Sequence, residues 1–451
     1  MSGVLELGLK LPAPGSRHVR RELHAQLREA ILDGRLTAGL QLPASRALAA
    51  DLGLSRNTVT AVYDTLLGEG LIEGRQGAGT FVAAAARIPA GARPAAGAAV
   101  RFDLRPGLPD SSGFPFDVWG RLSGRALRQF ARAPSGYREP AGHPALREAI
   151  AGHLSFARGL ACRAEDIVVT VGAQQAFDLI ARTAAGRVVA VEDPGYPATR
   201  AAFAAAGAQV RAVAADAEGL VVDALPADAA VVCVTPAQQF PMGAAMSEAR
   251  RAALLHFARR TGALIVEDDY GGEFRFEGPA RPPLFAQGAG RVAYVGTFSQ
   301  SLLPALRIGF VVAPSSLREA LAEARALSDW HGPAIEHATL AAFIAEGHLA
   351  RHVRRMRKVY ARRRSTMLTA LARCEALEVA PGGAGLHVTA LLKHGDAAEV
   401  AERALTAGVR VETLAPFAAE RAAPQGFALG YGLIGAEEIE GAMAVLAGAI
   451  E

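Results

Sequence analysis

VGTFSQSLLPALRIGF, residues 295–310, joins two apolar runs through a turn rich in polar side chains. The first run enters a Gly-Thr-Phe-Ser turn, and the second begins directly after Arg307. Thr297, Ser299 and Arg307 can all donate hydrogen bonds to an anion, and an arginine can do so with two parallel bonds. Gln300 stands in the middle of the turn. The stretch therefore predicts two strands with a polar binding site between them.

Similar apolar runs recur along the chain, with helical segments between them. Near-continuous Val, Ile and Ala runs that alternate with helices predict a mostly parallel sheet covered on both faces. Ligands of such sheets bind beyond the carboxyl ends of the strands. The runs are IVVTVG (167–172), RVVAVED (187–193), AVVCVTP (230–236), ALIVEDDY (263–270), VAYVGTFS (292–299) and IGFVVAP (308–314).

The first of these runs ends at Gly172, directly before a predicted helix. Backbone N–H groups at a helix N-terminus are free to bind a phosphate. The N–H groups of Ala173 and Gln174 are therefore candidate phosphate donors, and the turn of residues 295–310 would complete the cradle.

Two other motifs are suited to a flat, protonated ring. VEDPGYP presents Tyr196 from a Pro-Gly turn, where it can cover an aromatic ring. VEDDY places Asp268 at a strand end, with Asp269 beside it and Tyr270 following. A carboxylate there can pair with a protonated pyridine nitrogen, as proteins do for pyridoxal phosphate. A lone strand-end Asp is more often a helix cap, and a lone Tyr is often core, so the order and spacing of the motifs carry the prediction.

The chain divides into three segments by composition. Residues 84–100 are rich in Ala, Gly and Pro without amphipathic period, which is typical of a linker. Residues 10–83 before it form a compact block, and residues 101–451 after it contain the alternating strands and helices.

The first block predicts helix, helix–turn–helix and hairpin. In the first helix Leu23, Leu27, Ala30 and Ile31 share one face, and a short second helix follows with Ser45 as its cap. Ser55 caps a third helix, which leaves Arg56, Asn57 and Thr60 exposed in its first turn. LIEGRQGAGTFV then forms two β runs around a Gly-rich turn. The apolar stripe of the third helix comprises Val59, Val62, Tyr63, Leu66 and Leu67. This is the winged-helix plan, whose recognition helix presents its N-terminal residues to the major groove.

Composition narrows the class of protein. Apolar residues make up 51% of the chain, which allows a large core, and the net charge is only +4. Cys162, Cys233 and Cys374 lie far apart, so neither a disulfide framework nor a CxxC metal motif is predicted. The N-terminus lacks signal-peptide features, and no apolar run reaches the roughly 18 residues that a membrane span requires. We therefore expect a cytoplasmic protein without membrane contact.

RHVRRMRKVYARRR (351–364) is strongly basic, as some nucleic-acid-binding segments are. His352, Met356 and Tyr360, however, recur at i, i+4 and i+8 and give the run an apolar edge. We therefore interpret it as a long exposed or interfacial helix.

The first block, from LHAQLREAI to GAGTFV, resembles the GntR-type winged-helix domain nearly end to end. That resemblance implies binding to a double-stranded DNA operator. It places the DNA contacts at Arg46, Ser55, Arg56, Asn57 and Thr58 and, in the wing, at Gly77 and Gly79.

The later motifs, together with LRPGLPD (104–110), EPAGHPALREAI (139–150) and TPAQQFPMG (235–243), resemble the type I aminotransferase fold with its smaller C-terminal subdomain. A winged helix followed by this fold resembles the MocR family of transcriptional regulators. The resemblance implies a homodimer whose C-terminal domain binds pyridoxal phosphate and senses a small-molecule effector. It assigns the cofactor contacts to Ala173, Gln174, Tyr196, Asp268, Tyr270, Thr297, Ser299, Gln300 and Arg307.

The chain departs from the aminotransferase pattern at three positions. Gln300 stands where the lysine that links the cofactor covalently belongs, and a Gln amide nitrogen is no nucleophile because its lone pair is delocalised. No lysine lies between residues 11 and 357. Gln238 replaces a common His in the segment along the cofactor ring. Ala428 stands where aminotransferases often place an Arg that binds the substrate carboxylate.

These departures favour a DNA-binding regulator that senses a small molecule without catalysis, with any pyridoxal phosphate bound non-covalently. Two alternatives remain at this point. One is an active pyridoxal phosphate-dependent aminotransferase with an accessory DNA-binding domain, which Gln300 disfavours. The other is a regulator whose second domain is a dimerisation scaffold without a ligand.

Overall fold

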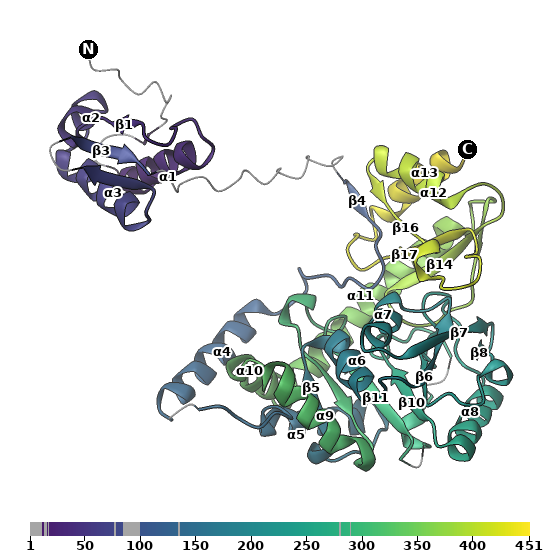
Figure 1. Ribbon diagram of the computed structural model, residues 1–451. Coiled ribbons are helices and arrows are strands. Elements are labelled where there is room, and N and C mark those ends of the chain that lie inside the picture. Colours follow the sequence, from purple (N-terminus) through teal and green to yellow (C-terminus); the bar gives the residue numbers. More distant parts are fainter. Residues whose placement is uncertain are drawn as a thin grey trace. The chain divides into compact units, whose positions relative to one another are not determined.

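The computed structural model describes residues 11–12, 16, 18–75, 78–83, 100–133, 136–278, 281–288 and 290–451. The chain forms two compact units, Met1–Gly97 and Ala98–Glu451 (Figure 1). Of the predicted linker, Val100 alone belongs to the described residues.

The described part of the N-terminal unit has the winged-helix plan. Its helices enclose one apolar core, to which α1 contributes Leu23, Leu27, Ala30 and Ile31 and α3 contributes most of its predicted stripe. The antiparallel strands follow the order β1-β3-β2. The elements are α1 (Val19–Leu32), β1 (Gln41–Leu42), α2 (Ser45–Asp51), α3 (Arg56–Gly68), β2 (Ile72–Arg75) and β3 (Gly79–Val82).

Two details of the sequence-based expectation for this unit are wrong. Leu67 is predicted to face the core, but it is 51% exposed. Each residue of an α-helix turns about 100° from the last, so Leu67 falls beyond the buried face that Leu66 occupies. Ser45 is predicted to cap α2, but it is the first residue of the helix, and Ala44 precedes it as a cap without a side-chain hydrogen bond.

An eight-stranded, mostly parallel sheet forms the centre of the C-terminal unit, with the order β5-β12-β11-β10-β9-β6-β7-β8. The strand β12 is antiparallel to both of its neighbours, and β8 is antiparallel to β7. The six predicted runs are all strands of this sheet, whereas the outer strands β7 and β8 have no counterpart among them. The strands are β5 (Ile167–Thr170), β6 (Val188–Asp193), β7 (Gln209–Asp216), β8 (Gly219–Leu220), β9 (Val231–Val234), β10 (Leu264–Asp268), β11 (Val292–Thr297) and β12 (Gly309–Val312).

Helices cover both faces of this sheet, because alternate residues of the strands enter different apolar clusters. Val189 and Val191 pack with α6 (Gly172–Arg182), α7 (Pro197–Ala205) and α9 (Ser315–Asp329). Ala190, between them, packs on the other face with α8 (Glu248–Thr261). Burial on both faces explains why the strands are nearly continuous apolar runs. The helices α4 (Phe116–Ala131), α5 (Pro144–Arg158) and α10 (Ala334–Ala345) pack in a further cluster with α11 (His348–Leu371).

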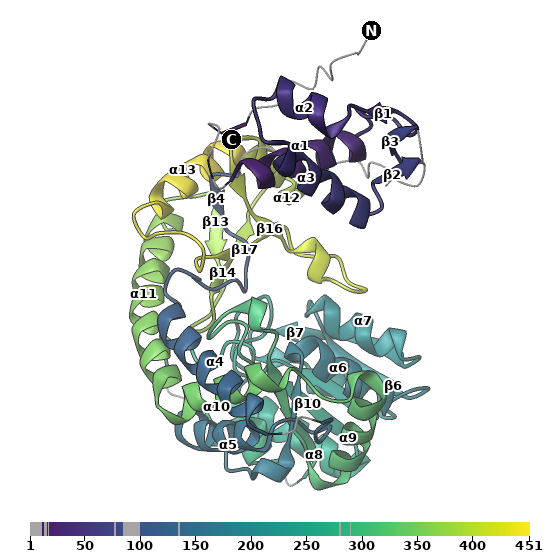
Figure 2. The same ribbon diagram turned by 90° about the vertical axis from the view of Figure 1, so that its left-hand side faces the viewer.

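The basic run of residues 351–364 lies within α11, which runs along the unit from the large sheet to a smaller subdomain (Figure 2). His352, Met356 and Tyr360 are buried, as the i, i+4, i+8 pattern predicts. The subdomain is an antiparallel sheet of order β13-β14-β17-β16 covered by two helices. Its elements are β13 (Leu377–Val379), β14 (His387–Leu392), α12 (Ala397–Thr406), β16 (Glu412–Thr413), β17 (Gly426–Gly430) and α13 (Ile439–Ile450), with β15 (Val409–Arg410) paired to β4 (Phe102–Asp103).

Candidate functional site

A pocket of about 480 Å³ lies beyond the carboxyl ends of β10 and β11, at the start of α6. All nine residues that the sequence assigns to the cofactor line it. They come from separate segments because the carboxyl ends of neighbouring parallel strands meet at one edge of the sheet. The lining residues are Ala173, Gln174, Tyr196, Asp268, Tyr270, Thr297, Ser299, Gln300 and Arg307, joined by Pro106, Gly107, Leu108, Phe240 and Pro304.

One wall of the pocket has the form of an anion cradle. The chain enters α6 through Gly172 at φ 74°, where a Cβ atom would lie 2.9 Å from Arg307 Nη2. That same Nη2 donates to the carbonyl oxygen of Val171 at 2.9 Å. Across the turn after β11, the hydroxyl groups of Thr297 and Ser299 lie 3.0 Å apart. These hydroxyls, the arginine and the helix N-terminus are the donors that a phosphate requires.

The pocket also carries a buried carboxyl group. Asp268 ends β10, is 7% exposed, and its Oδ1 has no hydrogen-bond partner among the described residues. Burial, followed by the charges of Asp269, Glu192 and Glu267, raises the pKa of Asp268 to about 8. Asp269, the next residue, is instead paired with Arg158 and accepts from the hydroxyl of Tyr294 at 2.5 Å. Asp268 is thus the acid that can receive a cationic ligand group.

Aromatic side chains also line the pocket. Phe240 contacts Tyr196 and Tyr270 edge-on, with ring centroids 5.7 Å and 5.6 Å apart. The sequence did not single out Phe240, although it stands only two residues beyond Gln238 in TPAQQFPMG. Gln238 is buried near Gly271 and Gly385 and is not a lining residue of this pocket.

Gln300 lines the pocket next to Gly107, where an added Cβ would lie 3.5 Å from its amide nitrogen. The side-chain oxygen of Gln300, Oε1, is buried without a hydrogen-bond partner among the described residues. Neither Lys358 nor Lys393, the lysines in the described part of the chain, lines the pocket.

Ala428 lies in β17 and is fully buried against Leu414 and Phe417. Phe240 packs against this small cluster from the pocket side. An apolar cluster therefore stands behind the pocket wall at the position where the resemblance to aminotransferases implies a carboxylate-binding Arg.

A carboxylate that the sequence did not single out connects the smaller subdomain to this wall. Asp193, at the end of β6, accepts hydrogen bonds from the backbone N–H groups of Ala419, Glu420 and Arg421 at 2.8–3.1 Å. Nearby, the N–H of Gly195 donates to the carbonyl oxygen of Phe417 at 2.9 Å. The rings of Phe417 and Phe240 also pack together, with their centroids 5.0 Å apart. The hydrogen bonds of Asp193 and Gly195 therefore hold the back of the pocket wall in place.

In the N-terminal unit, the predicted DNA contacts gather at the start of α3 and on α2. Arg46, Arg56 and Asn57 are exposed. The hydroxyl of Ser55 accepts from the backbone N–H of Thr58 at 3.1 Å and lies 2.8 Å from the Thr58 hydroxyl, which confirms Ser55 as the N-cap.

In the wing, Gly79 is exposed and has φ 109°. A Cβ there would lie 2.8 Å from the Gln41 amide nitrogen, which donates to Ala78 O at 2.7 Å. A side chain at position 79 would therefore disturb the wing turn. Gly77, the other predicted wing contact, lies outside the described residues.

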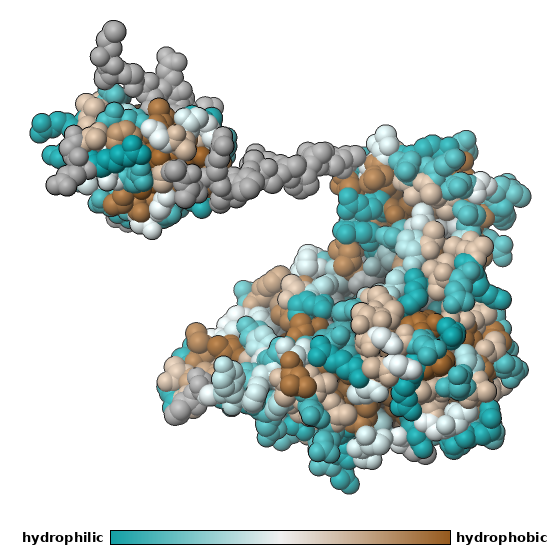
Figure 3. All heavy atoms as spheres, in the orientation of Figure 1, coloured by the Kyte–Doolittle hydropathy of each residue, from teal (hydrophilic) through white to brown (hydrophobic). Residues whose placement is uncertain are grey.

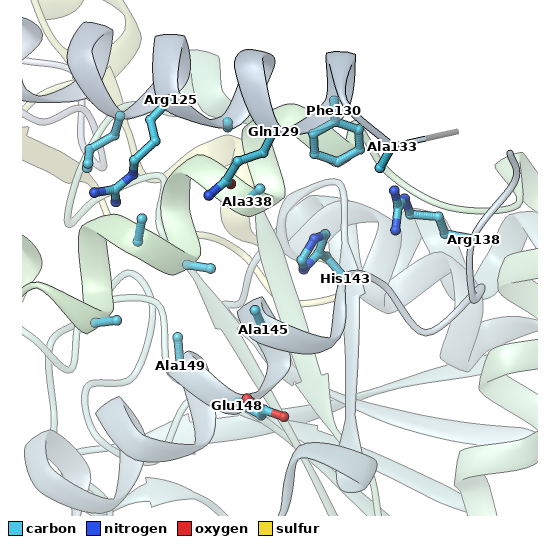
Figure 4. A pocket seen from close by; sticks show the side chains of 15 residues that line it. Arg125, Gln129, Phe130, Ala133, Arg138, His143, Ala145, Glu148, Ala149 and Ala338 are labelled. Carbon is cyan, nitrogen blue, oxygen red and sulfur yellow. The ribbon is translucent and has the colours of Figure 1, made fainter. Parts of the chain in front are cut away.

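A second hollow, of about 670 Å³, lies between α4, α5 and α10 (Figure 4). Its floor is made of small side chains such as Ala145, Ala149 and Ala338 (Figure 4). At one end the Arg138 guanidinium lies over the Phe130 ring, 4.8 Å from its centroid. None of the residues that the sequence assigns to the cofactor or to DNA lines this hollow.

Two family descriptions match the chain, one for each unit. "Bacterial regulatory proteins, gntR family" covers residues 19–82, and "Aminotransferase class I and II" covers residues 125–426. The fold and the matches together define a DNA-binding regulator with an aminotransferase-like domain. The chain belongs to the MocR family of transcriptional regulators, in which these two domains are fused in this order.

Known relatives match over most of their length. The chain is 35% identical to the probable rhizopine catabolism regulatory protein MocR of Rhizobium meliloti, covering 92% of this chain and 90% of that protein. It is 33% identical to the pyridoxine biosynthesis transcriptional regulator PdxR of Corynebacterium glutamicum, with 91% of each covered. Among solved structures, a kynurenine aminotransferase from Pyrococcus horikoshii matches 77% of this chain and 90% of its own, at 29% identity and a TM-score of 0.71.

Across the described ranges, none of the helices combines the length and apolar character that a bilayer crossing requires.

Proposed function

We propose that the C-terminal unit senses a small molecule in the 480 Å³ pocket and performs no transamination, while the N-terminal unit binds the operator. The observation that carries this proposal is Gln300 at the pocket wall, in a pocket that no described lysine lines. An amide nitrogen cannot form the covalent link that aminotransferases require, because its lone pair is shared with the carbonyl group.

The residues present fit pyridoxal phosphate. Arg307, Thr297 and Ser299, with the N–H groups of Ala173 and Gln174, would hold its phosphate. The unpartnered Asp268 carboxyl would pair with the ring nitrogen, while Tyr196, Phe240 and Tyr270 would enclose the ring. In enzymes this cofactor supplies an electron sink for amino-acid chemistry. Here the surrounding side chains would bind and orient it without a covalent bond.

The charges of the pocket restrict what else it can hold. Among the described residues that line it, Arg307 is the one cationic side chain and Asp268 is the one acidic side chain. Ala428 and its apolar neighbours stand behind the wall and provide no second guanidinium. One anionic group, one cationic or proton-donating group and a flat apolar body thus describe the ligand that this chain's own residues favour.

An absorbance titration of the purified full chain with pyridoxal phosphate tests the proposal. We expect a saturable shift in the near-ultraviolet and visible spectrum, and release of all the cofactor when the complex is denatured and desalted. Cofactor that stays attached after denaturation would instead indicate an enzyme-like link. The absence of any spectral change would indicate a scaffold or a pocket adapted to another ligand.

Operator recognition is expected to depend on Arg56, which is exposed in the first turn of α3. Arg56→Ala should weaken operator binding by about 1–3 kcal/mol, the usual value of a bidentate base contact. Gel-shift titrations against the operator and a scrambled duplex measure this loss. Arg28→Ala is the matched control, because Arg28 pairs with Glu69 at the other end of α3. If both variants bind the operator as the natural protein does, Arg56 does not read the operator.

We expect a homodimer that occupies two half-sites, since a single winged helix covers one. The C-terminal unit is the expected source of the interface. Its helix α4 exposes the large apolar side chains of Phe116 and Leu127, and apolar residues gather on the surface around α4 (Figure 3). Light scattering at micromolar concentration should give the mass of two chains, and the mass of one chain would contradict the proposal.

A further inference from the structure

The turn between β5 and α6, which forms the anion cradle, is held at both backbone groups of Val171. The N–H of Val171 donates to the side-chain oxygen of Gln175 at 2.8 Å. The carbonyl oxygen of Val171 accepts from Arg307 at 2.9 Å. Arg307 is one of the predicted phosphate donors. The backbone of the single residue Val171 therefore holds both the start of α6 and the cationic side chain.

Gln175 is itself held from behind. Arg325, on α9, is fully buried, and its Nη1 donates to the same Gln175 oxygen that accepts from Val171. Its Nε lies 2.8 Å from a carboxylate oxygen of Asp329, one turn further along α9. Neither Nε nor Nη2 has a hydrogen-bond partner among the described residues, so the contact of Nε with Asp329 is an ion pair without a hydrogen bond. A continuous chain of contacts therefore runs from α9 through Gln175 to the cradle.

Burial of an arginine side chain carries a large desolvation free energy that opposes folding. Removing the charge of Arg325 from water costs several kcal/mol, and the side chain of its ion-pair partner Asp329 is 37% exposed, so the attraction between them offsets only part of that cost. Two of its guanidinium nitrogens, Nε and Nη2, have no hydrogen-bond partner among the described residues, which adds to that cost. What the residue provides is orientation, because its charged donor binds the same Gln175 oxygen that accepts from Val171.

We infer that Arg325 is a positioning residue for the anion cradle: through Gln175 it fixes the β5–α6 turn, and with it the N–H donors of α6 and Arg307. This inference rests on the proposed function, in which the cradle binds the phosphate of the ligand. Arg325 does not line the pocket and acts only through Gln175.

The inference is tested with Arg325→Met, which keeps most of the side-chain length and removes the donors. The probes are pyridoxal phosphate and pyridoxal, which lacks the phosphate, and both are titrated against the full chain. At metal sites, substitution of a residue that orients a direct ligand typically lowers the affinity about 10–100-fold. We therefore expect Arg325→Met to weaken pyridoxal phosphate binding by roughly ten-fold and to leave pyridoxal binding unchanged.

Two further variants complete the test. Gln175→Met should give the same selective loss, and the double variant should lose no more than either single one, since both act as a unit. Arg318→Met is the matched control, because Arg318 lies on the same helix but pairs with Glu165 and Asp166 instead. Equal weakening of both probes by Arg325→Met would overturn the inference, because a general loss of packing would then explain the effect.

Amide hydrogen exchange of the ligand-free protein separates this inference from the proposed function. We expect faster exchange of the amides of residues 171–174 in Arg325→Met than in Arg318→Met. Unchanged exchange at these amides would overturn the positioning role, whatever the ligand. If the natural protein binds neither probe, the proposed function fails, and the exchange rates alone decide the role of Arg325.

Discussion

Gln300→Lys is expected to attach pyridoxal phosphate covalently to a protein for which we propose reversible binding of that cofactor. The pocket retains Thr297 and Ser299 before position 300, Arg307 after it and Asp268 at the neighbouring strand end. A lysine at position 300 would be partly desolvated and close to a guanidinium, and both effects lower the pKa of an amine and so favour its nucleophilic form. Borohydride reduction followed by mass spectrometry should find one cofactor per chain at residue 300 in the variant and none in the natural protein.

Gln287→Lys is the control for labelling of an added lysine, because Gln287 is exposed and does not line the pocket. It should remain unlabelled under the same conditions. Labelling of the natural protein at Lys358 or Lys393 would show that another lysine forms the link and would refute our interpretation of Gln300. A Gln300→Lys variant that binds no cofactor would show that the pocket is built for a different ligand.

The sequence is sufficient to predict which residues meet in the pocket. Gly172, Tyr196, Asp268 and the turn of residues 295–310 each follow an apolar run, and the runs alternate with helices. The rules for parallel sheets then bring the carboxyl ends of those runs to one edge. This reasoning needs only local pattern and topology. The nine side chains it names do line one pocket in the structure.

The features that the sequence does not predict are contacts between distant residues. Asp193 bonds to backbone N–H groups 226–228 residues away, and Arg325 reaches Gln175 across 150 positions. Arg325 stands in no motif, and the VEDPGYP motif that contains Asp193 does not indicate its partners, because both roles depend on the packing of another element against the residue. Phe240 was missed for a related reason: its side chain is placed by contacts with Tyr196 and Phe417, which no local period indicates.

The ligand-free protein is expected to lose stability as the pH rises from 6 to 7.5, and Asp268 should account for a large part of the loss. The pKa of Asp268 is raised from 3.8 to about 8 by burial first and by Asp269, Glu192 and Glu267 next. The folded chain therefore binds a proton that the unfolded chain has already released. The stabilising effect is complete below pH 3.8 and is lost as the pH rises toward 8, by about 1.4 kcal/mol per pH unit.

Asp268→Asn removes this titrating group and keeps the shape of the side chain. Urea unfolding of the full chain, followed at the transition of the C-terminal unit, should show the natural protein losing about 2 kcal/mol more than the variant between pH 6 and 7.5. The variant should keep some pH dependence, because burial also raises the pKa values of Glu192 and Glu267 to about 7.

Asp178→Asn is the control, since Asp178 is a residue of α6 whose side chain is 42% exposed and pairs with Arg182. The free energy of unfolding of this control should change with pH as that of the natural protein does. If Asp268→Asn follows it as well, Asp268 is already ionised in the folded chain, and a partner must neutralise it before any ligand arrives. An equal dependence of the free energy of unfolding on pH in Asp268→Asn and the natural protein would thus refute the description of Asp268 as a carboxyl that stays neutral until a cationic ligand group pairs with it. A weaker dependence of the free energy of unfolding on pH in Asp268→Asn alone would mean that binding of a cationic ligand group at Asp268 is coupled to release of the Asp268 proton.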